Sequence, residues 1–123
     1  MAYTEYQIER IEGILKQKVK SFDGKKFMGG YCFFLNDKMC VGLDIDKNTG
    51  KDRLMARIGE EAMSTALKRK GCKLMDITRK PLKGFVFVDP EGFDRDKDLE
   101  YWIQLAVDFN PCAKKSKKRK RTR

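Results

Sequence analysis

The amino-acid sequence predicts an α+β fold of two layers, with three helices packed on a mostly antiparallel sheet of about five strands. Apolar residues recur at helical spacing in three segments, and short apolar runs bounded by turn residues lie between these segments. Most of the runs follow one another instead of alternating with helices, which favours an antiparallel sheet with helices packed on it. The expected order of elements is α-β(3-4)-α-β-α.

The first expected element is an amphipathic helix over residues 5–19. Thr4 and Gln7 have the spacing of a capping box, in which the hydroxyl accepts a hydrogen bond from a free backbone N–H and the amide reaches back to the helix start. One face of this helix is apolar, and its residues are Ile8, Ile11, Leu15 and Val19.

Four short runs follow, and we expect three or four of them to be strands. The runs are residues 25–28, 31–35, 39–45 and 53–58. The segment Asn36-Asp37-Lys38 can turn the chain, so the second and third runs form a hairpin. In the fourth run the residues alternate, and Leu54, Ala56 and Ile58 share one side.

The second half of the chain adds two helices and one strand. Gly59 ends the fourth run, Glu60 and Glu61 suit a helix N-terminus because the helix dipole favours anions there, and Gly71 can cap that helix after Lys70. A well-covered strand is expected at residues 84–88, and a last helix that stops at Pro111 begins among Asp94, Asp96 and Asp98. Its apolar stripe, which we interpret as core, is Leu99, Trp102, Ile103, Ala106 and Phe109.

The basic residues are concentrated at the C-terminus. The chain has 28 Lys and Arg residues against 18 Asp and Glu residues, a formal net charge of +10. Eight of the basic residues lie in the last twelve positions, which contain no acid: Lys114, Lys115, Lys117, Lys118, Arg119, Lys120, Arg121 and Arg123. Residues 1–111 therefore hold 20 basic and 18 acidic residues, about +2. We expect a domain over residues 1–111 and a disordered basic tail over residues 112–123, because the tail has too little apolar surface to offset the entropy cost of ordering.

The sequence favours a cytoplasmic protein without a membrane segment. No run approaches the roughly 18 apolar residues of a membrane-spanning helix, and the N-terminus has no basic start followed by an apolar block. The cysteines are Cys32, Cys40, Cys72 and Cys112, and no pair has zinc-site spacing. We interpret them as reduced thiols, with Cys32 and Cys40 as small core residues on adjoining strands that could approach each other.

Several spaced motifs resemble those of the TfoX N-terminal domain family. They are residues 25–30 (KKFMGG), residues 55–59 (MARIG), Met75-Asp76 followed by residues 83–88 (KGFVFV), and Trp102 in the last helix. The resemblance covers roughly residues 2–110. It implies a two-layer fold like that of secretion chaperones, and a link to transcriptional regulators of DNA-uptake competence. In those regulators the domain precedes a second, C-terminal domain, and here we expect a stand-alone copy with the basic tail in its place.

No set of residues suggests catalysis or metal binding. The chain has no histidine, which removes the commonest general base and a common metal ligand. Asp44, Asp46 and Asn48 copy three ligand positions of a calcium loop, but Thr49 stands where the loop needs a glycine and Met55 where it needs a bidentate glutamate. We therefore expect no catalytic residue, no metal and no cofactor, and we interpret the loop as a polar hairpin loop.

A group of cations near the expected strand ends is the candidate binding site. Its members could converge on an anion or a partner, and Gly29, Gly30 and Gly84 could let a backbone approach closely. Alternatively, the cations are solvated or pair with Asp52, Asp76 or Asp89. The candidates are Lys25, Lys26, Arg53, Arg57 and Lys83, with Arg79 and Lys80 nearby.

Two hypotheses about function follow. The first is a non-catalytic regulatory module that acts in transcriptional regulation of the competence type through an unidentified protein partner. The second is an accessory protein that binds DNA or RNA without sequence specificity through the basic tail, because lysine and arginine contacts to phosphates release counterions and carry no base information. The sequence does not indicate the oligomeric state.

Overall fold

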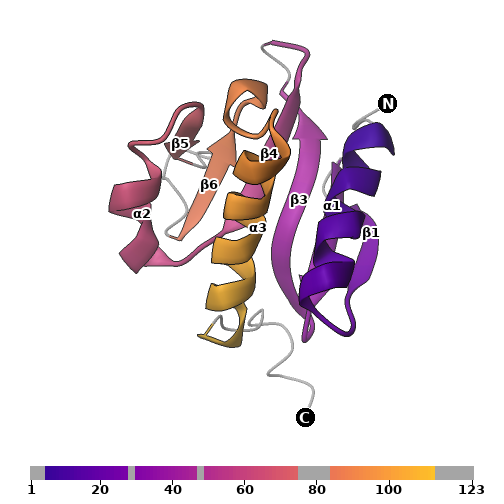
Figure 1. The fold of residues 1–123 in the computed structure, drawn as a ribbon. Helices are drawn as coiled ribbons and strands as arrows, with labels where there is room; N and C mark the ends of the chain where they lie inside the picture. The colour runs from indigo at the N-terminus through magenta and orange to yellow at the C-terminus, as the bar shows by residue number, and fades with distance from the viewer. Residues whose placement is uncertain (1–4, 28–29, 47–48, 75–83, 113–123) are drawn as a thin grey trace.

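The computed structural model describes residues 5–27, 30–46, 49–74 and 84–112 (Figure 1). The helices are α1 (Glu5–Lys18), α2 (Glu60–Ala66) and α3 (Asp96–Phe109), and two short 3-10 helices are η1 (Pro90–Gly92) and η2 (Asn110–Cys112). The strands are β1 (Asp23–Phe27), β2 (Gly30–Leu35), β3 (Lys38–Ile45), β4 (Asp52–Arg57), β5 (Cys72–Leu74) and β6 (Phe85–Val88).

The strands form one six-stranded sheet in the order β1-β2-β3-β4-β6-β5, and all neighbours are antiparallel. The chain runs through four adjacent strands, crosses over by α2 to the far edge, and returns as β6 between β4 and β5. The α+β class and the antiparallel sheet are confirmed, and the sheet has one strand more than the five expected. The additional strand, β5, has only three residues, which is too short to show an alternating pattern.

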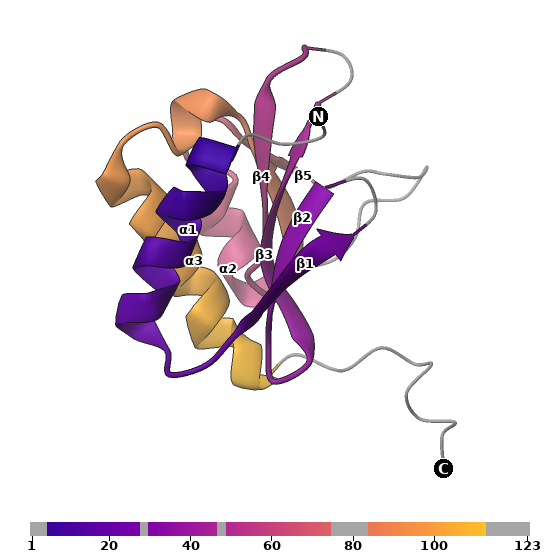
Figure 2. The same ribbon diagram turned by 90° about the vertical axis from the view of Figure 1, so that its right-hand side faces the viewer.

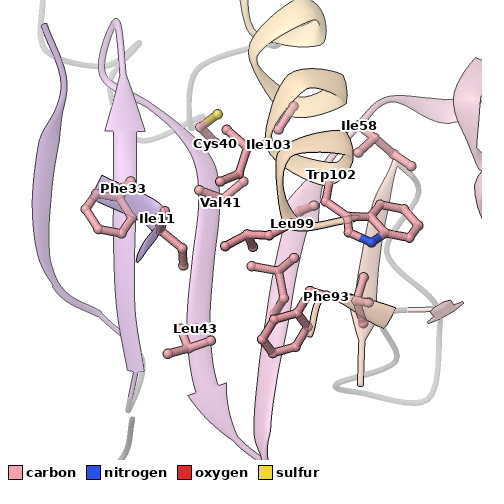
Figure 3. Packing of buried hydrophobic residues seen from close by; sticks show 14 of the residues in the cluster. Ile11, Phe33, Cys40, Val41, Leu43, Ile58, Phe93, Leu99, Trp102 and Ile103 are labelled. Atoms are coloured by element: carbon pink, nitrogen blue, oxygen red, sulfur yellow. The ribbon is translucent and has the colours of Figure 1, made fainter. Parts of the chain in front are cut away.

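The helices all lie on one face of the sheet, so the domain has the two layers that the sequence predicts (Figure 2). Apolar residues of α1, α3 and the central strands fill the space between the layers (Figure 3). The largest side chains there that are fully buried belong to Trp102, Phe33 and Phe93. Because burial of apolar area is the main favourable term in folding, this layer of contacts holds the two layers together.

The predicted helices and strands are found with small shifts at their ends. Helix α1 buries Ile8, Ile11 and Leu15 as its periodicity indicates, while Thr4 of the expected capping box lies outside the described residues. The hairpin turn consists of Asn36 and Asp37, whose φ angles of 54° and 65° are those of the tight turn that joins antiparallel strands. Its two strands are longer than expected by one residue each.

Helix α2 is shorter than the sequence indicates. It ends at Ala66, and a turn follows in which backbone hydrogen bonds join Lys68 to Thr65 and Arg69 to Ala66. Gly71 has the positive φ expected of it, 81°, but it closes this turn instead of capping the helix directly. The guanidinium of Arg69 lies 3.7 Å from the centre of the Tyr101 ring and pairs with Asp98 of α3 at 3.2 Å. Both contacts join this turn to α3.

Polar contacts fix both ends of α3. Near its start, the indole N–H of Trp102 donates to the carbonyl of Gly92 at 2.9 Å. Beyond its end, the buried Asn110 donates to the carbonyl of Leu35 at 3.2 Å and accepts from the amide of Asn36 at 3.0 Å. Buried polar groups stabilise a fold only when they are paired, so these bonds set the position of α3 along the sheet.

The lengths of the helices bear on whether any of them could cross a membrane. Helices α1 and α3 have 14 residues each. Within the ranges that the structure describes, no helix combines the length and the apolar composition needed to cross a bilayer.

Replacing Trp102 by alanine should lower the free energy of unfolding by about 3–5 kcal/mol, because the change empties a large volume in the core. The indole is fully buried, and its loss also leaves the carbonyl of Gly92 without a donor. Chemical denaturation measures the effect. Tyr6→Ala is the matched control, since Tyr6 is 65% exposed and should change stability little. An unchanged midpoint for Trp102→Ala would contradict the packing of α3.

Candidate functional site

The sheet face opposite the helices carries a second apolar cluster, which we call the outer sheet face. Cys32, Met55 and Phe87 form its buried centre, and the half-buried Phe34, Met39 and Phe85 pack around them. At the middle of this face a side chain on Gly42 would come within 2.8 Å of the Cys32 sulfur and 2.9 Å of the Met55 methyl group. The cluster therefore requires glycine there for its packing.

Three of the predicted cations border this face. Lys25 lies 4.8 Å from the centre of the Phe34 ring, Arg53 3.7 Å from Phe87, and Arg57 5.2 Å from Phe85. A cation over an aromatic face is attracted by the ring quadrupole, by about 0.5–1 kcal/mol at exposed sites. The three cations thus lie on one surface, but each lies over a different aromatic ring.

The other predicted cations lie elsewhere. Lys26 pairs in register with Tyr31, whose ring packs against the core on the helix side, so Lys26 is on the other side of β1. Lys83, Arg79 and Lys80 lie outside the described residues, as do the eight cations of the tail from Lys114 onward.

Arg53 belongs to an ionic network at one end of β4. Its guanidinium donates two hydrogen bonds to the carboxylate of Asp44, at 3.0 and 2.9 Å, and these bonds raise its pKa. Asp46 lies 3.8 Å from both Arg53 and Lys73, and Lys73 pairs with Asp89 at 3.2 Å. A bidentate arginine–carboxylate pair is among the strongest polar contacts in proteins. Arg53 therefore fixes the β3–β4 hairpin and has limited capacity for an external anion.

In the same network, the carboxylates that resemble calcium ligands interact with cations of the protein. Both oxygens of Asp44 accept from Arg53, and the buried Asp46 faces two cations. Across the described ranges, no group of three or more Cys, Asp or Glu side chains is placed to hold a metal ion.

A pocket of about 690 Å³ lies where α2 begins and α3 ends. It is formed by Arg57 at the end of β4, by the loop and first turn that follow, by Gly84, and by the last turns of α3. Gly59 has a φ of 89°, and a side chain there would come within 2.5 Å of the Phe109 ring, so only glycine lets α2 start this close to α3. The lining residues are Arg57, Ile58, Gly59, Glu60, Glu61, Ala62, Gly84, Leu105, Asp108, Phe109 and Cys112.

The pocket has a charged rim. Glu60, Glu61 and Asp108 are exposed carboxylates, and Arg57 is the one cation among the lining residues that the structure describes. Burial lowers the pKa of Arg57 from its ordinary value. Carboxylates that act as acids or bases are usually activated by burial, whereas these three are solvated. The arrangement suits recognition of a ligand better than chemistry on one.

The structure also adds features that the sequence did not single out. Lys73 joins the ionic network from β5. A single lysine in a three-residue strand forms no sequence pattern from which its position could be predicted. The pocket combines residues 57–62, Gly84, and Leu105, Asp108, Phe109 and Cys112, which are far apart along the chain. Alternation in β4 was the one available signal, because it places Arg53, Met55 and Arg57 together on the side opposite to Leu54 and Ala56.

The fold and these surfaces define a small α+β domain built on one antiparallel sheet with helices on a single face. The model of the family described as TfoX N-terminal domain matches residues 14–110, and the chain belongs to this family. The resemblance of its motifs is thereby confirmed. The family is a regulatory one, not a known enzyme family, and it is associated with competence regulation.

Beyond the family, the chain has no recognisable relative among the proteins compared with it. No curated protein and no solved structure shows significant similarity to the chain. The expected likeness to secretion chaperones therefore stays a prediction.

The cysteines of the hairpin lie on opposite faces of the sheet. A bulge between β2 and β3 pairs Phe33 with Val41 and Phe34 with Met39, which turns Cys40 into the helix-side core while Cys32 stays on the outer sheet face. Both are buried free thiols, as expected, but they do not face each other. Burial raises the pKa of each to about 12, with Asp44 adding to the effect at Cys32.

Thiol reagents at pH 8 should modify Cys112 first and leave Cys32 and Cys40 unmodified until the domain unfolds. The thiolate is the reactive form, and a pKa of about 12 leaves roughly one thiolate in 10⁴ at this pH. Time-resolved thiol counting measures this, and Cys112→Ser should remove the fast phase. Fewer than four thiols in denatured, unreduced protein, or copurifying zinc by elemental analysis, would contradict the assignment of free thiols.

Proposed function

We propose that this domain is a non-catalytic regulatory module that acts in competence-type regulation of transcription through a protein partner. Membership of the TfoX N-terminal domain family supports the regulatory role. The observation that supports a protein partner is the outer sheet face. There, half-buried aromatic rings are bordered by cations, and no described helix packs on them. Aromatic residues and arginine are enriched at protein interfaces and at their energetic centres.

The chemistry of the outer sheet face selects the kind of partner. Lys25 and Arg57 place positive charge beside Phe34 and Phe85. A protein segment with apolar side chains and flanking carboxylates would bury against the rings while its acids pair with the cations. Such complementary charge mainly sets specificity and the rate of association.

Charge reversal on the outer sheet face should abolish capture of the partner. The variant is Lys25→Glu with Arg57→Glu, and the control is Lys16→Glu with Lys97→Glu, which makes the same change in net charge on exposed positions of α1 and α3. Tagged proteins are used to capture partners from cell lysate with and without nuclease, and captured proteins are identified by mass spectrometry. A protein that survives nuclease, binds the control and is lost with the variant supports the proposal.

Two other results would overturn it. Loss of all captured protein on nuclease treatment would mean that nucleic acid mediates the contacts. Equal capture by the variant and the control would place the partner surface away from Lys25 and Arg57. Thermal denaturation of both variants checks that each is folded.

A second candidate function is nucleic-acid binding through the basic tail. The observation that favours it is the segregation of charge, since eight of the 28 basic residues lie beyond Cys112 without a single acid, while residues 1–111 are near +2. Contacts from such a segment reach phosphates and not base edges, so this binding would be independent of sequence.

Binding of labelled duplex DNA should weaken steeply with salt. If half of the eight cations engage phosphates, the log–log slope is about −3.6, and affinity falls by roughly two decades between 50 and 200 mM salt. Fluorescence anisotropy with duplex DNA and single-stranded RNA measures the slope. Deleting residues 113–123 should remove the binding; equal affinity without the tail would place the nucleic-acid surface on the domain, and no binding by either protein at 50 mM salt would reject this function.

A further inference from the structure

The basic tail begins at the wall of the pocket. Cys112, the last residue of η2, lines the pocket together with Asp108 and Phe109 of α3. The first cation of the tail, Lys114, follows two residues later. An extended chain advances about 3.3–3.6 Å per residue, so the eleven residues from Ala113 to Arg123 can reach every part of the lining.

The pocket is complementary to the tail in charge, and part of its lining is apolar. Its rim carries Glu60, Glu61 and Asp108, and only Arg57 opposes them among the described lining residues. Neither glutamate forms an ion pair with another residue in the described part of the chain. The apolar part of the lining is supplied by Ile58, Ala62, Leu105 and Phe109.

We propose that the pocket binds the basic tail of its own chain. Lysine and arginine side chains bury their methylene stems on apolar surface while their charged ends stay at a polar rim, which is the surface that this pocket offers. Attachment at Cys112 makes the contact intramolecular, with an effective concentration in the millimolar range for a short flexible linker. Weak, largely electrostatic contacts are then enough to keep a substantial fraction of the tails bound.

This contact would give the domain a regulatory device. Nucleic acid, or any acidic partner that binds the tail, would have to compete with the pocket for it. A ligand that binds the pocket would release the tail. The inference goes beyond the proposed function, because the contact lies within one chain and its test requires neither partner nor nucleic acid.

Proteolysis of the tail in the full chain tests the proposal. Trypsin cleaves at the tail's lysines and arginines only while they are free, and intact mass spectrometry follows the loss of the tail. The pocket variant is Glu60→Gln, Glu61→Gln and Asp108→Asn, which keeps a side-chain oxygen at position 108 to accept the hydrogen bond of Gln104. If the dissociation constant is near the effective concentration, about half of the tails are bound, and the variant should lose its tail about twofold faster than the wild type in 0.1 M salt.

Matched controls separate this contact from a general effect of charge. The control variant is Glu5→Gln, Glu9→Gln and Asp94→Asn, which removes three exposed carboxylates that do not line the pocket. Its tail should be cleaved at the wild-type rate. In 1 M salt, where the screening length is only about 3 Å, all three proteins should be cleaved at one rate.

Three outcomes would overturn the proposal. Equal cleavage of the wild type and the pocket variant in 0.1 M salt would mean that the tail does not occupy the pocket. The same acceleration in the control variant would indicate general attraction to the domain. Protection that grows with protein concentration would assign the pocket to the tail of a second copy.

Discussion

The position of α3 on the sheet is the constraint on which the rest of this structure depends. Trp102 is fully buried and hydrogen-bonds to Gly92, which holds η1 beneath the start of the helix. At the other end Asn110 binds the β2–β3 hairpin through Leu35 and Asn36. A helix held at two points cannot slide along the sheet, so the residues in its last turns keep fixed positions relative to α2 and β4. The pocket exists because of that fixed position.

The elements that the sequence predicts well are those with a long regular pattern. Helix α3 shows its stripe over about three turns, and the hairpin shows both its turn residues and its apolar strands. Strand β5 was missed because three residues carry no period, and α2 was predicted too long because Gly71 was expected to cap the helix directly after Lys70. In the structure Arg69 instead stacks on Tyr101 and pairs with Asp98, and such tertiary contacts leave no trace in local sequence.

The candidate site was predictable only in part, for a related reason. Alternation in β4 places Arg53 and Arg57 on one side, and the structure puts both over aromatic rings of the outer sheet face. The choice of Asp44 as the partner of Arg53 depends on the register of β3 against β4, where these two residues pair directly. Register is set by how whole strands align, and a list of acids such as Asp52, Asp76 and Asp89 does not contain that information.

The small net charge of residues 1–111 conceals a local separation of charge. Positive groups border the outer sheet face, and carboxylates dominate the rim of the pocket, although residues 1–111 sum to about +2. Arg57 belongs to both surfaces, since it stacks on Phe85 and also lines the pocket. A ligand that drew this guanidinium towards one surface would change the charge at the other. Arg57 is therefore the one side chain through which a contact at the outer sheet face and a contact at the pocket would affect each other.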